Sequence, residues 1–254
     1  MVYIFSCFYY LIPHSARLFR IRSVTFSPRF IDYSSVYGLM FTIDSIMSFT
    51  FFTTLSNVAL DIVLVVFIVL DMILLVTGKD YKNNRLYMLK FLMTLSITLT
   101  CLVYMIILGP TSDDGLIGAY LHNHAGSLGV HLIGPVFAIA DFLIFDKGFK
   151  ARKIYAIYAV IPPLCYVGFV YILAVLGVRW YDTMTAPYNF LNYNVPTGWF
   201  GWDLSQMGSE SLGIGVVYMI VVLLLIFIGI GLLYLTINGA GKSIETQNTE
   251  LVSE

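Results

Sequence analysis

His131 is the residue of this sequence best suited to proton transfer, because a histidine titrates near neutral pH and can take and return a proton. Pro135 follows it by four residues and has no amide hydrogen to bond the carbonyl of His131. We therefore expect a helix that bends at the histidine. The alternative is a histidine that only forms a hydrogen bond between helices.

A second group of polar residues follows one face of a helix. Thr54, Asn57 and Asp61 share a stripe when each residue turns the helix by about 100°. An ionisable side chain is costly in lipid, so this stripe should face protein or a wet cavity. Asp141 should face inward for the same reason. Asp61 and Asp141 are therefore candidates for the lining of a polar cavity.

The composition of the chain is rich in apolar residues and poor in charged ones. Of 254 residues, 59% are hydrophobic and 11% are charged, and the mean hydropathy is +0.84. A soluble domain carries about a quarter charged residues, so the expected partner of this surface is membrane lipid. The net charge of −1 gives no reason to expect nucleic acid.

Five apolar stretches are long enough to cross a hydrocarbon core, which needs about 20 helical residues. They cover residues 58–77, 87–108, 127–145, 154–178 and 212–237. A sixth crossing is expected before residue 54. The predicted fold is an all-α, polytopic helical membrane bundle with five clear and in total six transmembrane helices. Residues 1–237 should form a single integral membrane domain, and residues 238–254 a short polar cytoplasmic tail in a coil conformation.

Basic residues predict the orientation of the bundle, since cytoplasmic loops are rich in lysine and arginine. Residues 78–86 and 146–153 carry seven lysines and arginines between them and should be cytoplasmic. Residues 110–126 and 179–211 carry one and should be external. This orientation puts Thr54 and His131 in the same, outer leaflet, and we expect their side chains to approach within about 5 Å.

The long external loop is rich in tyrosine and tryptophan, including Tyr188 and Trp199. One interpretation is an aromatic belt at the membrane interface. The other is a lid over the outer opening, with Tyr188 and Trp199 against the substrate, because a loop of this length needs a structural or functional role.

The sequence predicts neither a metal nor a cofactor. Three cysteines are scattered among apolar residues, without the paired spacing of a thiolate site. His122, His124 and His131 with Asp113 match no recognised pattern of metal ligands.

Four short segments, taken together, resemble the Pr-six-Pr family of bacterial membrane proteins. They are FTTLSN at 52–57, HLIGP at 131–135, DFLIF at 141–145 and PYNFLN at 187–192. The resemblance covers roughly residues 48–237 and implies a bacterial cell-membrane protein. More remotely, the chain is similar to the androgen-induced and androgen-dependent TFPI-regulating membrane proteins, which are threonine hydrolases of fatty acid esters.

The remote similarity implies that Thr54 is a nucleophile and His131 its general base and acid. Asn57, one helical turn from Thr54, is placed to polarise the ester carbonyl. The chain departs from those hydrolases in a histidine-to-proline spacing that is one residue shorter and in Asn57, which replaces an acidic residue. Two other functions stay open. Asp61, Asp141 and His131 could be relay groups of a small-solute or proton transporter, or the polar residues could pair with one another in a non-catalytic membrane scaffold.

Overall fold

The computed structural model describes residues 46–110, 128–146, 149–208 and 210–253. The predicted first crossing lies outside the described residues, as do Asp113, His122 and His124. A single 3-10 turn, Ile46–Thr50, leads into the first long helix.

Two long helices pack against each other in the described bundle. Helix α4 spans Phe52–Thr77 and ends at Gly78, whose φ of 75° suits a residue without a side chain. Helix α5 spans Asn84–Val103 and is capped by the Asn83 side chain, which accepts hydrogen bonds from the first backbone amides. A π-helical turn, Tyr104–Leu108, then extends α5.

The helix that contains His131 is irregular at the position that Pro135 predicts. Residues Gly129–Ile133 form a π-helical turn, and helix α8 follows over Gly134–Phe145. The amide of Gly134 bonds the carbonyl of Gly129, five residues earlier. Because Pro135 cannot donate to the His131 carbonyl, the chain takes the wider π turn here.

Prolines also divide the next helix. Helix α9 covers only Tyr155–Tyr158, and α10 begins at Ile161 and runs over Ile161–Val175. Pro162 and Pro163 occupy its first turn, where a missing amide hydrogen costs nothing.

The last helix, α11, spans Val216–Ser253. The predicted coil after residue 237 is therefore wrong, because the helix continues through the polar tail. Residues 242–252 contain neither proline nor glycine, the two residues that most disfavour the interior of a helix.

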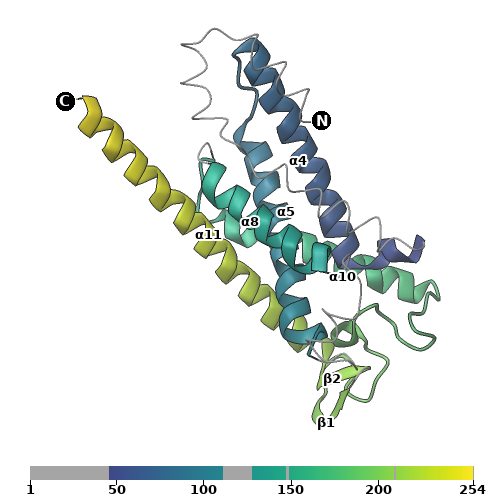
Figure 1. The fold of residues 1–254 in the computed structure, drawn as a ribbon. Helices are drawn as coiled ribbons and strands as arrows, with labels where there is room; N and C mark the ends of the chain where they lie inside the picture. The colour runs from purple at the N-terminus through teal and green to yellow at the C-terminus, as the bar shows by residue number, and fades with distance from the viewer. Residues whose placement is uncertain (1–45, 111–127, 147–148, 209, 254) are drawn as a thin grey trace.

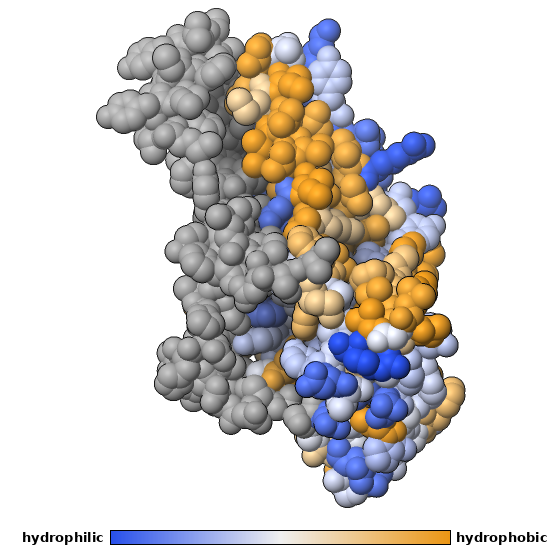
Figure 2. All heavy atoms as spheres, turned by 90° about the vertical axis from the view of Figure 1, so that its right-hand side faces the viewer, coloured by the Kyte–Doolittle hydropathy of each residue, from blue (hydrophilic) through white to orange (hydrophobic). Residues whose placement is uncertain are grey.

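Within the described ranges, four helices are long and apolar enough to cross a membrane. Their ranges are Phe52–Thr77, Asn84–Leu108, Tyr155–Val175 and Val216–Gly239. Gly129–Phe145 is apolar but shorter than these, so a fifth and a sixth crossing stay predictions. Figure 1 shows α4, α5 and α11 running lengthwise, with the strands at one end. Figure 2 shows apolar side chains over much of one face, which is the surface that lipid would cover.

The end that carries the strands is formed by the loop between α10 and α11. It contains a 3-10 turn, Asn189–Leu191, and an antiparallel hairpin of β1, Trp202–Gly208, and β2, Ser211–Ile214. Gly213 has a φ of 71°, and a Cβ there would lie 2.5 Å from the carbonyl oxygen of Asp203. Only glycine fits this close approach.

The two basic loops lie together at the opposite end of α5. The amide of Lys150 donates to the side-chain oxygen of Asn84 at 2.8 Å. The structure thus places residues 78–86 and the described part of 146–153 at one end, as the charge bias predicts. Their assignment to the cytoplasm stays a prediction.

Candidate functional site

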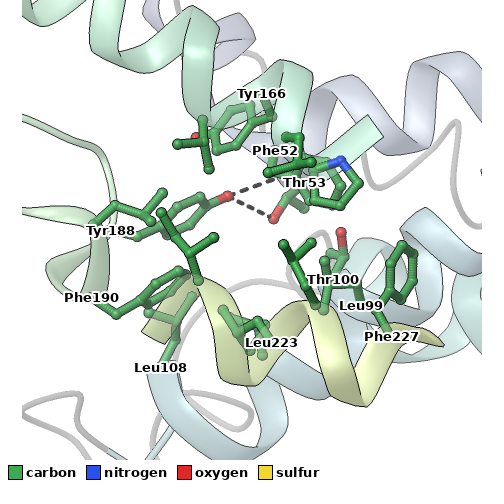
Figure 3. A pocket seen from close by; sticks show the side chains of 17 residues that line it. Phe52, Thr53, Leu99, Thr100, Leu108, Tyr166, Tyr188, Phe190, Leu223 and Phe227 are labelled. Atoms are coloured by element: carbon green, nitrogen blue, oxygen red, sulfur yellow. Dashed lines mark hydrogen bonds between the residues drawn. The ribbon is translucent and has the colours of Figure 1, made fainter. Parts of the chain in front are cut away.

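A small cavity of about 60 Å³ lies where α4 begins and α5 ends. Residues of α4, α5, α10, α11 and the loop before α11 line it, and most of them are apolar (Figure 3). The residues with hydroxyl groups among the described lining side chains are Thr53, Thr100, Tyr166 and Tyr188. The cavity combines an apolar wall with a few hydroxyls, the kind of lining that small-molecule sites have.

Tyr188 reaches into this cavity from the loop and contacts the first turn of α4. Its hydroxyl oxygen accepts a hydrogen bond from the Thr53 amide at 3.2 Å and lies 3.4 Å from the Thr53 hydroxyl. Its ring stacks on Phe190, with ring centroids 5.4 Å apart. Burial raises the pKa of the Tyr188 phenol above its ordinary value.

A second pair of hydrogen bonds ties Thr50 to aromatic side chains. The Tyr166 hydroxyl donates to the Thr50 carbonyl at 2.9 Å, and the Trp180 indole donates to the Thr50 hydroxyl at 2.9 Å. Both aromatic residues are buried. The turn before α4 is therefore bonded to α10 through Tyr166 and to the loop through Trp180. The first turn of α4 is bonded to the same loop through Tyr188.

A larger groove of about 290 Å³ lies on the other side of Phe52 and Tyr166. Those two residues line both spaces, and their rings meet edge to face, with centroids 5.1 Å apart. The groove runs between α4, α5 and α10 and includes the exposed side chain of Cys165. Two of its lining side chains, Cys165 and Phe169, are exposed on α10.

Thr54 is buried in the first turn of α4, but it is not among the described residues that line the cavity or the groove. The threonine in the cavity is its neighbour Thr53. Sequence reasoning missed Thr53, although a pair of adjacent threonines at a helix start offers two hydroxyls about 100° apart.

Asn57 connects the threonine turn to the histidine turn. Its amide nitrogen lies 2.8 Å from the carbonyl oxygen of Thr53 and 3.4 Å from that of Val130. Thr53 directly precedes Thr54, and Val130 directly precedes His131. The structure therefore brings together the two backbone segments that carry the predicted catalytic pair.

His131 itself is half-buried and stacks on Tyr104 of α5, with ring centroids 3.8 Å apart. Its Nδ1 atom is buried and has no hydrogen-bond partner within the described part of the chain. Tyr104 was not a predicted site residue. No signal in the sequence pairs it with His131, because the contact joins two helices.

Asp141 lies away from the cavity, in a buried cluster of charges. The ammonium of Lys90 forms ion pairs with Asp141 and, at 2.6 Å, with Asp146, and it lies 4.8 Å from the centre of the Phe67 ring. All three charged residues are at most 3% exposed. A lysine within an apolar helix was the sequence signal for this cluster, and it was overlooked.

The remaining predicted site residues are Asp61 and Trp199, and the second of these is exposed. Asp61 is half-buried on α4. Trp199 is 38% exposed and stacks on Tyr193, with centroids 4.6 Å apart, and it does not belong to the described lining of the cavity. Of the two predicted lid residues, Tyr188 therefore contacts the cavity and Trp199 packs within the loop.

Among the described residues, no group of three histidine, cysteine or acidic side chains could hold a metal ion. Comparison of the chain with family models, curated proteins and solved structures gives no match.

Proposed function

We propose that this chain is an integral membrane hydrolase that cleaves an ester of a lipid, with Thr54 as nucleophile and His131 as general base and acid. The Asn57 bridge carries the proposal. Its two hydrogen bonds join the backbone just before Thr54 to the backbone just before His131. Such a bridge holds a nucleophile and a base at a fixed separation, which an acyl-transfer site requires.

The reaction would proceed through an acyl-enzyme. The Thr54 hydroxyl oxygen attacks the ester carbonyl carbon while His131 takes its proton. The bond from that carbon to the alcohol oxygen then breaks, and His131 returns the proton to the leaving alcohol. Water repeats the sequence on the acyl-threonine and releases the carboxylic acid. The apolar groove would hold the acyl chain, with Tyr188 closing the neighbouring cavity.

Asn57 takes a positioning role in this proposal. The sequence suggested that it polarises the ester carbonyl, but its NH2 group already donates to two backbone carbonyls. The side-chain oxygen of Asn57 can only accept hydrogen bonds. It could not stabilise the negative oxygen that forms on the ester.

Labelling with a lipid-like fluorophosphonate tests the proposal, because it traps an activated hydroxyl without knowledge of the substrate. Thr54→Val and His131→Ala should abolish labelling of the purified protein. The matched control is Thr53→Val, which removes the adjacent hydroxyl and should leave labelling in place. If labelling is lost in Thr53→Val and kept in Thr54→Val, the nucleophile is Thr53, which lines the cavity. No labelling of the unmodified protein would overturn the hydrolase.

A pathway for protons or small solutes is the second candidate, and a different observation favours it. Lys90, Asp141 and Asp146 are charged and buried in the bundle, and buried ionisable groups in membrane proteins often form relays. Reconstituted liposomes would then show a proton flux that Asp141→Asn abolishes. Fluorophosphonate labelling without a proton flux would support the hydrolase and exclude the proton pathway.

A further inference from the structure

The rings of Tyr104 and His131 form a face-to-face stack between α5 and the start of α8. Their centroids are 3.8 Å apart, and their planes differ by 10°. Each ring belongs to a π-helical turn, Tyr104–Leu108 in one case and Gly129–Ile133 in the other. π turns within α-helices occur frequently at functional sites. Here both rings of the stack come from such turns.

A catalytic histidine needs a group that fixes its ring and stabilises the positive charge that it acquires. In serine hydrolases, a carboxylate bonded to Nδ1 does both. In the described residues, no hydrogen bond reaches Nδ1 of His131. Asp141, the acidic residue of the same helix, forms an ion pair with Lys90 instead. Within the described part of the chain, the ring of Tyr104 stacks on the imidazole of His131.

We infer that Tyr104 performs the task of that carboxylate: its ring fixes the plane of the His131 imidazole and stabilises the imidazolium through its π face. A cation over a tyrosine ring is attracted when it lies within about 6 Å of the ring centroid. The centroid of the His131 imidazole lies 3.8 Å from the centroid of the Tyr104 ring. The inference rests on the proposed function. Tyr104 would touch neither the ester nor the threonine, so it is a positioning residue.

The timing of the charge makes this contact useful for catalysis. His131 is positively charged only after it takes the proton of the nucleophile and before it returns that proton to the leaving group. An interaction that strengthens in this interval stabilises the transition state more than the bound substrate. Weakening the contact should therefore lower kcat and leave KM unchanged.

A series of fluorinated rings at position 104 tests the inference. The series starts from Tyr104→Phe and adds one, two and three fluorine atoms, which withdraw electrons from the π face and largely preserve the shape of the ring. For hydrolysis of a long-chain ester in detergent micelles, kcat should fall stepwise by about 10-fold in total. The kcat of Tyr104→Leu should fall at least as far. Tyr104→Trp should retain activity, because the π face of tryptophan attracts a cation more strongly.

Tyr193 provides the matched control. It stacks on Trp199 with centroids 4.6 Å apart and planes 13° from parallel, and no histidine takes part in that stack. The same fluorinated series at Tyr193 should leave kcat unchanged.

The possible outcomes separate this inference from the proposed function. An active protein whose kcat is the same across the series at 104 would overturn the role of Tyr104 and leave the hydrolase intact. An unmodified protein with neither hydrolysis nor labelling would overturn both. If Tyr104→Leu fails to fold, the fluorinated series still tests the role of the Tyr104 ring, because the fluorinated rings fill nearly the same space.

Discussion

The hydroxyl oxygen of Tyr188 lies 3.2 Å from the backbone nitrogen of Thr53, across 135 positions of the chain. The first amides of a helix have no partner within the helix. Phe51, at the N-cap position of α4, has an apolar side chain that cannot accept a hydrogen bond. A loop tyrosine therefore supplies the cap of α4, and the same bond holds the loop over the cavity.

Tyr188→Phe should loosen this loop, because it removes the hydroxyl and keeps the ring. We expect the free energy of unfolding to fall by about 1 kcal/mol and the loop over 179–211 to become more sensitive to proteases. Thermal unfolding in detergent and limited proteolysis would measure the two effects. Tyr181→Phe is the control, since that side chain is 69% exposed. Equal effects of both variants would contradict the role of the Tyr188 hydroxyl.

The stability of the protein should fall at alkaline pH. Burial raises the pKa of Tyr188 in the folded state, so the folded protein holds the phenol proton more tightly than the unfolded chain does. This contribution is complete below the ordinary tyrosine pKa of about 10 and is lost as the pH rises through the folded value. Unfolding followed at a series of pH values should show a decline that begins near pH 10 and is shallower in Tyr188→Phe.

Asn57→Ala should separate the threonine turn from the histidine turn. The loss of two buried hydrogen bonds should cost about 2 kcal/mol and slow fluorophosphonate labelling. Asn57→Asp should be worse, because a buried carboxylate would face the two carbonyl oxygens. The control is Asn238→Ala, at another fully buried asparagine, whose amide donates to the Asp146 carbonyl at 3.2 Å. It removes one hydrogen bond and should lower stability by about 1 kcal/mol without slowing the labelling.

Lys90→Met should destabilise the bundle strongly, since it removes the cation between two buried carboxylates. Breaking a buried ion pair costs about 3 kcal/mol or more. Lys82→Met is the comparison, because Lys82 pairs with Asp71 in a less buried setting and should cost about 1 kcal/mol or less. Denaturant unfolding of both variants measures the difference. Similar losses in the two variants would contradict the larger contribution expected of the buried cluster.

Cysteine labelling should find the two ends of the bundle on opposite sides of the membrane. In a background without Cys7, Cys101 and Cys165, cysteines placed at Lys79 and Lys150 should react only after the membrane is permeabilised. Cysteines at Tyr181 and Leu204 should react in intact cells. All four positions are exposed, so a lack of access would reflect the membrane. The reverse pattern would invert the predicted orientation.

The sequence by itself determined the main helical architecture of the described bundle. Apolar stretches of about 20 residues have no other stable arrangement in lipid than a helix, because every backbone group must find a partner within the segment. At Pro135, the missing amide hydrogen predicted a bend of the helix at His131, and the structure has a π turn at that position. The sequence prediction was wrong after residue 237, where α11 continues beyond the apolar stretch.

The contacts between helices were decided only by the tertiary structure. A helical stripe predicts which residues face inward but not the neighbour that each one meets, since that depends on the rotation and depth of another helix. The stack of Tyr104 on His131, the pairing of Lys90 with Asp141 and the Tyr188 cap on Thr53 are contacts of this kind. Periodicity placed Thr54 and Asn57 on one stripe, but only the packing of α4 against the histidine turn assigned the Asn57 amide to Val130.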